Sequence, residues 1–142
     1  MRILVIDGQG GKIGRSVVEH LRNVVSDEKL KDKNIEIIAV GTNSIATTSM
    51  LKAGADAGAT GENPVIVNCD SADFIIGPAG IVMANTLLGE ITPAMAVAVS
   101  SSRAKKILIP VNKCNNIIVG TQESGISEYV RLAIEKVKSL ME

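Results

Sequence analysis

The first 25 residues constrain the fold more than any other part of this sequence. A continuous apolar run, Ile3–Ile6, leads into a turn with four glycines, Gly8, Gly10, Gly11 and Gly14. From Ile13 onward the apolar residues recur at helical spacing, through Val17, Val18, Leu21, Val24 and Val25. A run that is apolar at every position is typical of a strand covered on both faces, as strands are in parallel sheets. This region therefore predicts a parallel strand, a tight glycine turn and an amphipathic helix.

The same alternation continues to the end of the chain. Further strands are predicted at 35–40, 55–59, 74–77 and 107–111, with 116–120 as an edge strand beside the last of them. Helices are predicted at 13–25, 43–53, 63–72, 79–88, 93–102 and 126–141, and the charged segment 26–33 is expected to be a solvated connection. Asn63-Pro64 and Thr92-Pro93 place two of the helix starts, because an N-cap residue followed by proline is a start signal.

This alternation predicts one α/β domain over residues 1–142. The expected sheet is open and mostly parallel, of the doubly wound, Rossmann-like kind, with helices on both faces. A chain of 142 residues, 46% of them hydrophobic, is large enough to form one core of this type.

Composition excludes several classes of partner. The 15 basic residues are balanced by 15 acidic ones, and Phe74 and Tyr129 are the only aromatic residues, so no nucleic-acid partner is expected. No membrane partner is expected either, because polar residues, glycine and proline interrupt the most apolar region, 81–99. With no leader peptide recognised and with Cys69 and Cys114 interpreted as free thiols, we expect a cytoplasmic protein.

Ligands of open α/β sheets bind beyond the carboxyl ends of the strands. In this sequence those ends carry glycines and small polar residues, which allow a ligand to approach the backbone and supply neutral hydrogen-bonding groups. The predicted binding residues are Gly8, Gln9, Gly10, Gly11, Lys12, Ile13, Gly14, Gly41, Thr42, Asn43, Ser44, Thr60, Gly61, Gly77, Pro78, Gly80 and Asn112.

The first glycine turn is the strongest of these signals. The common dinucleotide fingerprint G-x-G-x-x-G fails at Ile13, whereas G-x-x-G-x-x-G fits through Gly8, Gly11 and Gly14. Such a loop presents backbone N–H groups at a helix N-terminus, where the dipole favours a phosphate. The alternative is that the glycines only make a tight turn.

The nucleotide class is left open by the second predicted strand end. Gly41-Thr42-Asn43-Ser44 contains no acidic residue to hold a ribose 2′-hydroxyl, which favours NADP over NAD, although no arginine accompanies it. A mononucleotide or another small phosphorylated ligand fits equally well.

Two resemblances add to this interpretation. The stretch Gly11-Lys12-Ile13-Gly14 resembles the glycine loop of the dihydrodipicolinate reductases, which implies binding of NADH or NADPH at this loop. Taken whole, the chain resembles a small uncharacterised bacterial domain family with a Rossmann-like sheet. That resemblance rests on the runs 6–11, 51–63, 89–96 and 109–114, and it implies a fold and a shared site without an activity.

Catalytic candidates are few. Cys114 is a possible nucleophile because the adjacent Lys113 would lower the pKa of its thiol, but an incidental loop cysteine is the favoured interpretation, since the sequence positions no histidine as its base. Asp7 is a possible general base, although bonding to the amides of its own turn explains it better. The single His20 and the scattered cysteines predict no metal site.

Three functions therefore remain open. They are a nucleotide-binding domain, a metabolite sensor or scaffold without chemistry, and a thiol-dependent transferase or hydrolase. The apolar region 81–99 predicts a homodimer.

Overall fold

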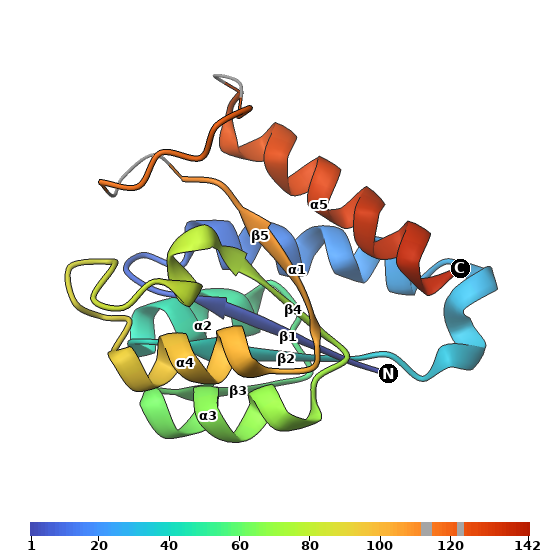
Figure 1. Ribbon diagram of the computed structural model, residues 1–142. Coiled ribbons are helices and arrows are strands. Elements are labelled where there is room, and N and C mark those ends of the chain that lie inside the picture. Colours follow the sequence, from blue (N-terminus) through green and yellow to red (C-terminus); the bar gives the residue numbers. More distant parts are fainter. Residues whose placement is uncertain (112–114, 122–123) are drawn as a thin grey trace.

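The computed structural model describes residues 1–111, 115–121 and 124–142, and it shows a parallel sheet with helices on both faces (Figure 1). The strands are β1 (Arg2–Asp7), β2 (Glu36–Gly41), β3 (Ala57–Thr60), β4 (Phe74–Pro78) and β5 (Lys105–Ile109). Their order in the sheet is β3-β2-β1-β4-β5, and every pair is parallel. The predicted fold class is confirmed.

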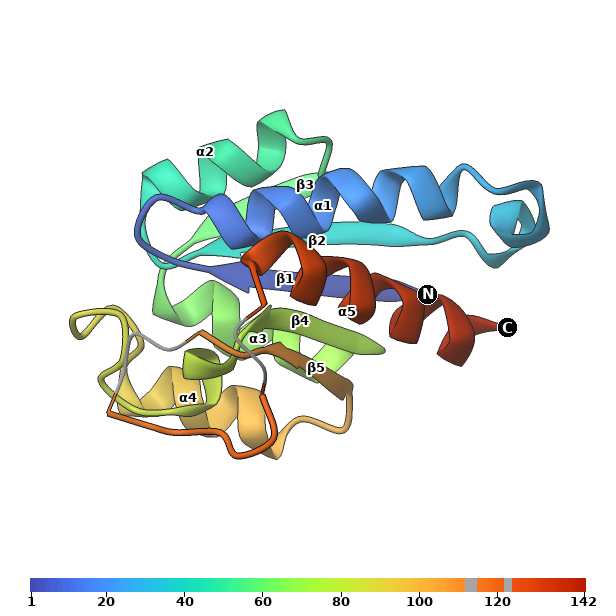
Figure 2. The ribbon, with the colours of Figure 1, turned by 90° about the horizontal axis from the view of Figure 1, so that it is seen from above.

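Two apolar layers hold the helices to the sheet. Ile3 and Val5 of β1 face the layer formed with α1 (Lys12–Val25), α2 (Ser44–Lys52) and α5 (Ile126–Met141). The alternate residues Leu4 and Ile6 face the layer formed with α3 (Glu62–Ser71) and α4 (Pro93–Ser101). Figure 1 shows α1 and α5 on one side of the sheet and α3 and α4 on the other, and Figure 2 looks down on the first side. Since both faces of β1 are covered, every position in its apolar run is buried.

The predicted helix over 79–88 is wrong. A short 3-10 helix, η2 (Ala79–Val82), is followed by turns up to α4. In these turns Asn85, Leu87 and Leu88 all have positive φ, a conformation that cannot continue a right-handed helix. The Thr86 hydroxyl donates to the carbonyl of Gly80 and stabilises the turn.

Other boundaries also differ from the prediction. Residues 116–120 form no strand, and α3 begins at Glu62, which places Pro64 within its first turn instead of at its first position. The segment 26–33, predicted as a solvated connection, contains a 3-10 helix, η1 (Glu28–Lys33), and its Leu30 is buried in the core. Within the described residues no helix is long and apolar enough to cross a membrane.

Candidate functional site

The strand order places a crevice at the carboxyl end of β1. The chain leaves β1 toward one face of the sheet and leaves its neighbour β4 toward the other, so the loops after these strands diverge. A cleft of about 810 Å³ lies there, within the usual range for a small-molecule site. Its described lining comes from the glycine loop, the end of β4, the turns before α4 and the segment before α5: Asp7, Gly8, Gln9, Gly10, Gly11, Lys12, Ile13, Pro78, Gly80, Asn85, Thr86, Leu87, Leu88, Val111, Asn115, Asn116 and Ile126.

Asp7 organises the glycine loop at the floor of this cleft. One carboxylate oxygen accepts from the Gly8 amide at 2.8 Å and the other from the Gly14 amide at 2.7 Å. Burial raises the pKa of Asp7, the bonds to the two amides oppose that shift, and the nearby charge of Glu90 adds to it. Of the two roles predicted for Asp7, the structure shows the bonding to its own turn.

Two of the loop glycines are required by packing. Gly11 has φ of 70°, and a Cβ added there would lie 2.7 Å from the Cα of Ala46 in α2. A Cβ on Gly14 would lie 2.5 Å from the sulfur of Met50, so this glycine lets α1 pack closely against its neighbours. A tight turn with close helix packing therefore explains Gly11 and Gly14 without any ligand.

Gly10 is different, because nothing lies within 4 Å of the position of an added Cβ. Packing does not explain it. Within the described part of the chain, the amides of Gly10 and Lys12 have no hydrogen-bond partner. The N-cap residue of α1, Gly11, has no side chain to cap the helix, and the first turn contains no acidic residue, although the Asp7 carboxylate accepts from the Gly14 amide in that turn. Two free N–H groups and the positive end of a helix dipole thus line the cleft, which is the arrangement that binds anions.

Glu90 is the site residue whose role the sequence analysis missed. The loop between β4 and α4 carries it to the glycine loop, where one carboxylate oxygen accepts from the Gln9 amide at 2.7 Å. The other oxygen accepts from the side-chain amide of Asn43 at 2.7 Å. The Asn43 side chain also donates to the Gln9 carbonyl at 3.0 Å. No local pattern signals a contact between residues 81 positions apart.

The polar residues that follow β2 and β3 stabilise the fold and do not line the cleft. The side chain of Asn43 caps α2 by accepting from the Ala46 amide. Thr47, which the prediction did not include, bonds through its hydroxyl to the Gly41 amide and to the hydroxyl of Thr60. The described lining of the cleft contains none of Gly41, Thr42, Asn43, Ser44, Thr60 and Gly61.

Packing within the sheet requires a glycine at Gly77, because an added Cβ would lie 2.4 Å from the carbonyl oxygen of Ile6. Pro78 and Gly80, two of the predicted binding residues, line the cleft. The predicted residues Asn112, Lys113 and Cys114 lie outside the described residues.

Comparison with protein families places this arrangement in a wider group. The family model described as Domain of unknown function (DUF3842) matches residues 2–142. The chain belongs to this family. The match runs from β1 through the glycine loop to α5, so the described cleft is formed by the DUF3842 domain itself. Among curated proteins, no sequence matches the chain.

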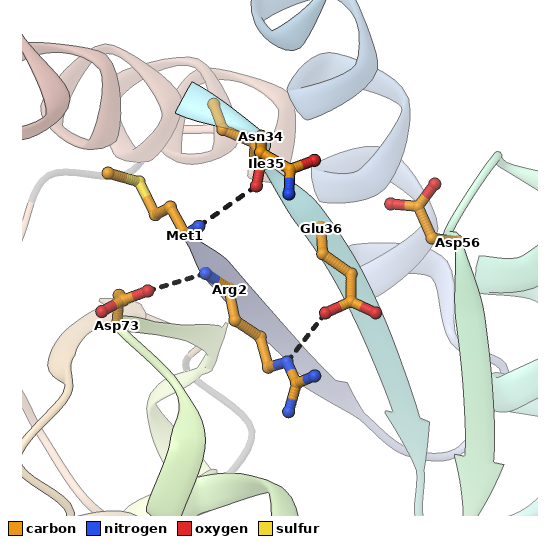
Figure 3. A pocket seen from close by; sticks show the side chains of 7 residues that line it. All are labelled: Met1, Arg2, Asn34, Ile35, Glu36, Asp56 and Asp73. Carbon is orange, nitrogen blue, oxygen red and sulfur yellow. Dashed lines mark hydrogen bonds and ion pairs between the residues drawn. The ribbon is translucent and has the colours of Figure 1, made fainter. Parts of the chain in front are cut away.

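A second cleft of the DUF3842 domain lies at the amino end of the sheet (Figure 3). It has a volume of about 610 Å³ and contains three carboxylates, but each of them already has a partner. Glu36 pairs with Arg2 at 2.9 Å, Asp73 accepts from the Arg2 amide, and Asp56 accepts from the Ile37 amide. These bonds hold the strand starts together, and they leave the glycine-loop cleft as the better candidate site.

The remaining chemical candidates of the DUF3842 domain lie elsewhere. Cys69 is buried in α3, and burial raises the pKa of its thiol to about 11, so it is not a nucleophile at neutral pH. His20 is exposed on α1, where its ring contacts the Ser16 carbonyl. The described residues contain no cluster of three His, Cys, Asp or Glu side chains that could hold a metal ion.

Proposed function

We propose that this protein binds a small phosphorylated molecule, with the phosphate on the backbone of the Gly8–Gly14 loop. The observation that carries the proposal is the pair of unpartnered amides at Gly10 and Lys12, at the N-terminus of α1, in residues that line the cleft. The exposed Lys12 side chain, which is also part of the lining, would add a cation beside the phosphate.

A nucleotide or another phosphorylated metabolite is the ligand class that this site supports. The sequence favoured NADP because no acidic residue follows β2. In the structure the carboxylate of Glu90 lies beside Asn43, directly after β2. An acidic group is therefore present there after all, and its absence no longer favours a 2′-phosphate. The resemblance of the loop to that of the dihydrodipicolinate reductases supports phosphate binding in general.

We propose that the protein binds this ligand and that Asp7 does not act as a general base. Asp7 and Lys12 are the ionisable residues in the described lining, and both oxygens of Asp7 already accept amide hydrogen bonds. Such a protein could act as a sensor in the cytoplasm. Thiol chemistry at Cys114 stays a prediction, which replacement by serine would test.

Thermal stability measured against NADPH, NADH, ATP, GTP and ribose 5-phosphate tests phosphate binding. A ligand at about 100 times its Kd should stabilise the fold by about 2.7 kcal/mol. The decisive variant is Gly10→Val, because its side chain enters open space above the free amides and removes room for a phosphate. We expect the ligand-induced shift to disappear while the unliganded protein keeps its stability.

A matched pair of lysines separates local from general charge effects. Lys12→Gln should weaken ligand binding, whereas Lys52→Gln, at the far end of α2, should not. If no phosphorylated compound raises the unfolding midpoint, or if the shift persists in Gly10→Val, the proposal is wrong.

The homodimer predicted through residues 81–99 also stays a proposal. Leu88 is 97% exposed and Val97 is 62% exposed in this region, which leaves apolar surface for a second copy to cover. Sedimentation at micromolar concentration tests it, and a monomer there would count against a dimer.

A further inference from the structure

The loop between β4 and α4 closes one half of the crevice in which a dinucleotide usually lies. We infer that the cleft takes a ligand with a single phosphorylated half, of the size of a mononucleotide or a sugar phosphate, and excludes a dinucleotide extended across β1 and β2. This inference rests on the proposed function and narrows its ligand class.

The first observation is a bridge between three loops. Glu90, before α4, binds both the Gln9 amide, after β1, and the Asn43 side chain, after β2. Asn43 closes the triangle by donating to the Gln9 carbonyl. Hydrogen bonds to an ionised carboxylate are about twice as strong as neutral ones, so this bridge holds the loop against β1 and β2.

The second observation is that the space behind the bridge is full. The Thr42 hydroxyl, a Glu90 carboxylate oxygen and a Leu87 methyl carbon lie 2.6, 2.8 and 2.9 Å from the position of a Cβ added to Gly8. The Thr42 hydroxyl is buried without a partner, which shows how closely this side is covered. In dinucleotide-binding sheets the adenosine ribose lies at the end of the second strand. Here Asn43, which follows β2, is hydrogen-bonded to the carboxylate of Glu90.

The third observation is where the open space lies. The described lining of the cleft comes from the glycine loop, the end of β4, the turns before α4 and the residues Val111, Asn115, Asn116 and Ile126. The lining includes no described residue of the loop between β2 and α2 or of the loop between β3 and α3. A phosphate on the Gly10 and Lys12 amides therefore has its remaining atoms over β4 and toward Asn115, Asn116 and Ile126.

The negative charge of Glu90 also disfavours a dinucleotide on the β2 side. A second phosphate placed toward β2 would approach the carboxylate of Glu90, and no salt bridge among the described residues neutralises that group. Like charges a few ångströms apart in a partly buried site repel strongly. The pyrophosphate of a dinucleotide is thus disfavoured on the closed side.

Titration calorimetry with ribose 5-phosphate, AMP and NADH tests the inference on the wild-type protein. We expect NADH to bind no more than about threefold more tightly than the better of the two smaller ligands, because its second half finds no site. NADH binding that is tighter by about tenfold or more would overturn the inference while leaving the proposed function intact. If none of the three binds, the inference fails, and the thermal-stability series with NADPH, ATP and GTP decides whether the proposed function fails with it.

The variant Glu90→Ala removes both bonds of the bridge and should open the β2 side. We expect the ratio of NADH affinity to AMP affinity to rise by about tenfold or more in this variant. Glu62→Gln is the matched control, because that carboxylate accepts from Thr92, two residues after Glu90, and no hydrogen bond among the described residues joins it to the glycine loop. A folded Glu90→Ala protein with an unchanged ratio would contradict the inference, and the wild-type titration decides the question if the variant does not fold.

Discussion

Replacement of Gly11 by alanine should destabilise the protein even when no ligand is present. Gly11 has φ of 70°, in the left-handed region that an L-residue enters at a cost of roughly 1–2 kcal/mol. The new Cβ would also lie 2.7 Å from the Cα and 3.1 Å from the carbonyl oxygen of Ala46. These are backbone atoms, so α2 itself has to move.

Overpacking a closely packed site costs about 1–3 kcal/mol, and with the left-handed backbone the total for Gly11→Ala is about 2–5 kcal/mol. At roughly 3 °C per kcal/mol for a domain of this size, the unfolding midpoint should fall by about 6–15 °C. Gly10→Ala is the matched control in the same loop, since its Cβ meets nothing within 4 Å. Its stability should stay within about 0.5 kcal/mol of wild type.

Urea unfolding of the wild type and the two variants measures this difference. The midpoint of Gly11→Ala should fall while the slope m stays constant, as expected for a change in stability alone. Equal stability of the two variants would refute the packing explanation of Gly11. It would also mean that Gly11, like Gly10, is free for a role in ligand binding.

Three further predictions concern the same loops and the sheet edge. In the monomer, Leu88→Asn should raise the free energy of unfolding by up to about 1 kcal/mol in a urea titration, because Leu88 is exposed with φ of 55° and asparagine tolerates that region. A destabilised variant would contradict this and would show that the leucine side chain is covered, as a dimer through residues 81–99 would cover it. Glu90→Gln removes a negative charge near Asp7, so an NMR titration should show the pKa of Asp7 falling toward its ordinary value, and an unchanged pKa would contradict the structure. Because the raised pKa makes ionisation of Asp7 cost stability as pH rises through it, this variant should lose less stability over that range. Partial burial of Asp56 raises its pKa, but the hydrogen bond from the Ile37 amide and the ion pair with Arg22 lower the pKa overall. In urea titrations, the stability lost in Asp56→Asn should therefore be largest near neutral pH and should shrink as the pH falls. A pH-independent difference would count against this.

Local sequence patterns determined the fold class and much of the glycine loop. The apolar run of β1 predicts a strand buried on both faces, and helical spacing after Ile13 predicts α1, because both periodicities are properties of adjacent residues. The position of Asp7 at the end of that strand indicates its bonds to loop amides. The failed helix over 79–88 shows the limit of this reasoning, because apolar composition alone does not reveal the left-handed residues in the turns after η2.

Only the tertiary structure decided which polar residues face the cleft. Asn43 and Thr60 follow strands in the predicted manner, yet they bond within the fold, while Glu90 reaches Gln9 from 81 residues away. The sequence alone also does not show that Gly11 is enclosed by α2 and that Gly10 is open. These properties depend on which loops meet at the end of the sheet, and that meeting follows from strand order and packing between distant segments, which no local periodicity encodes.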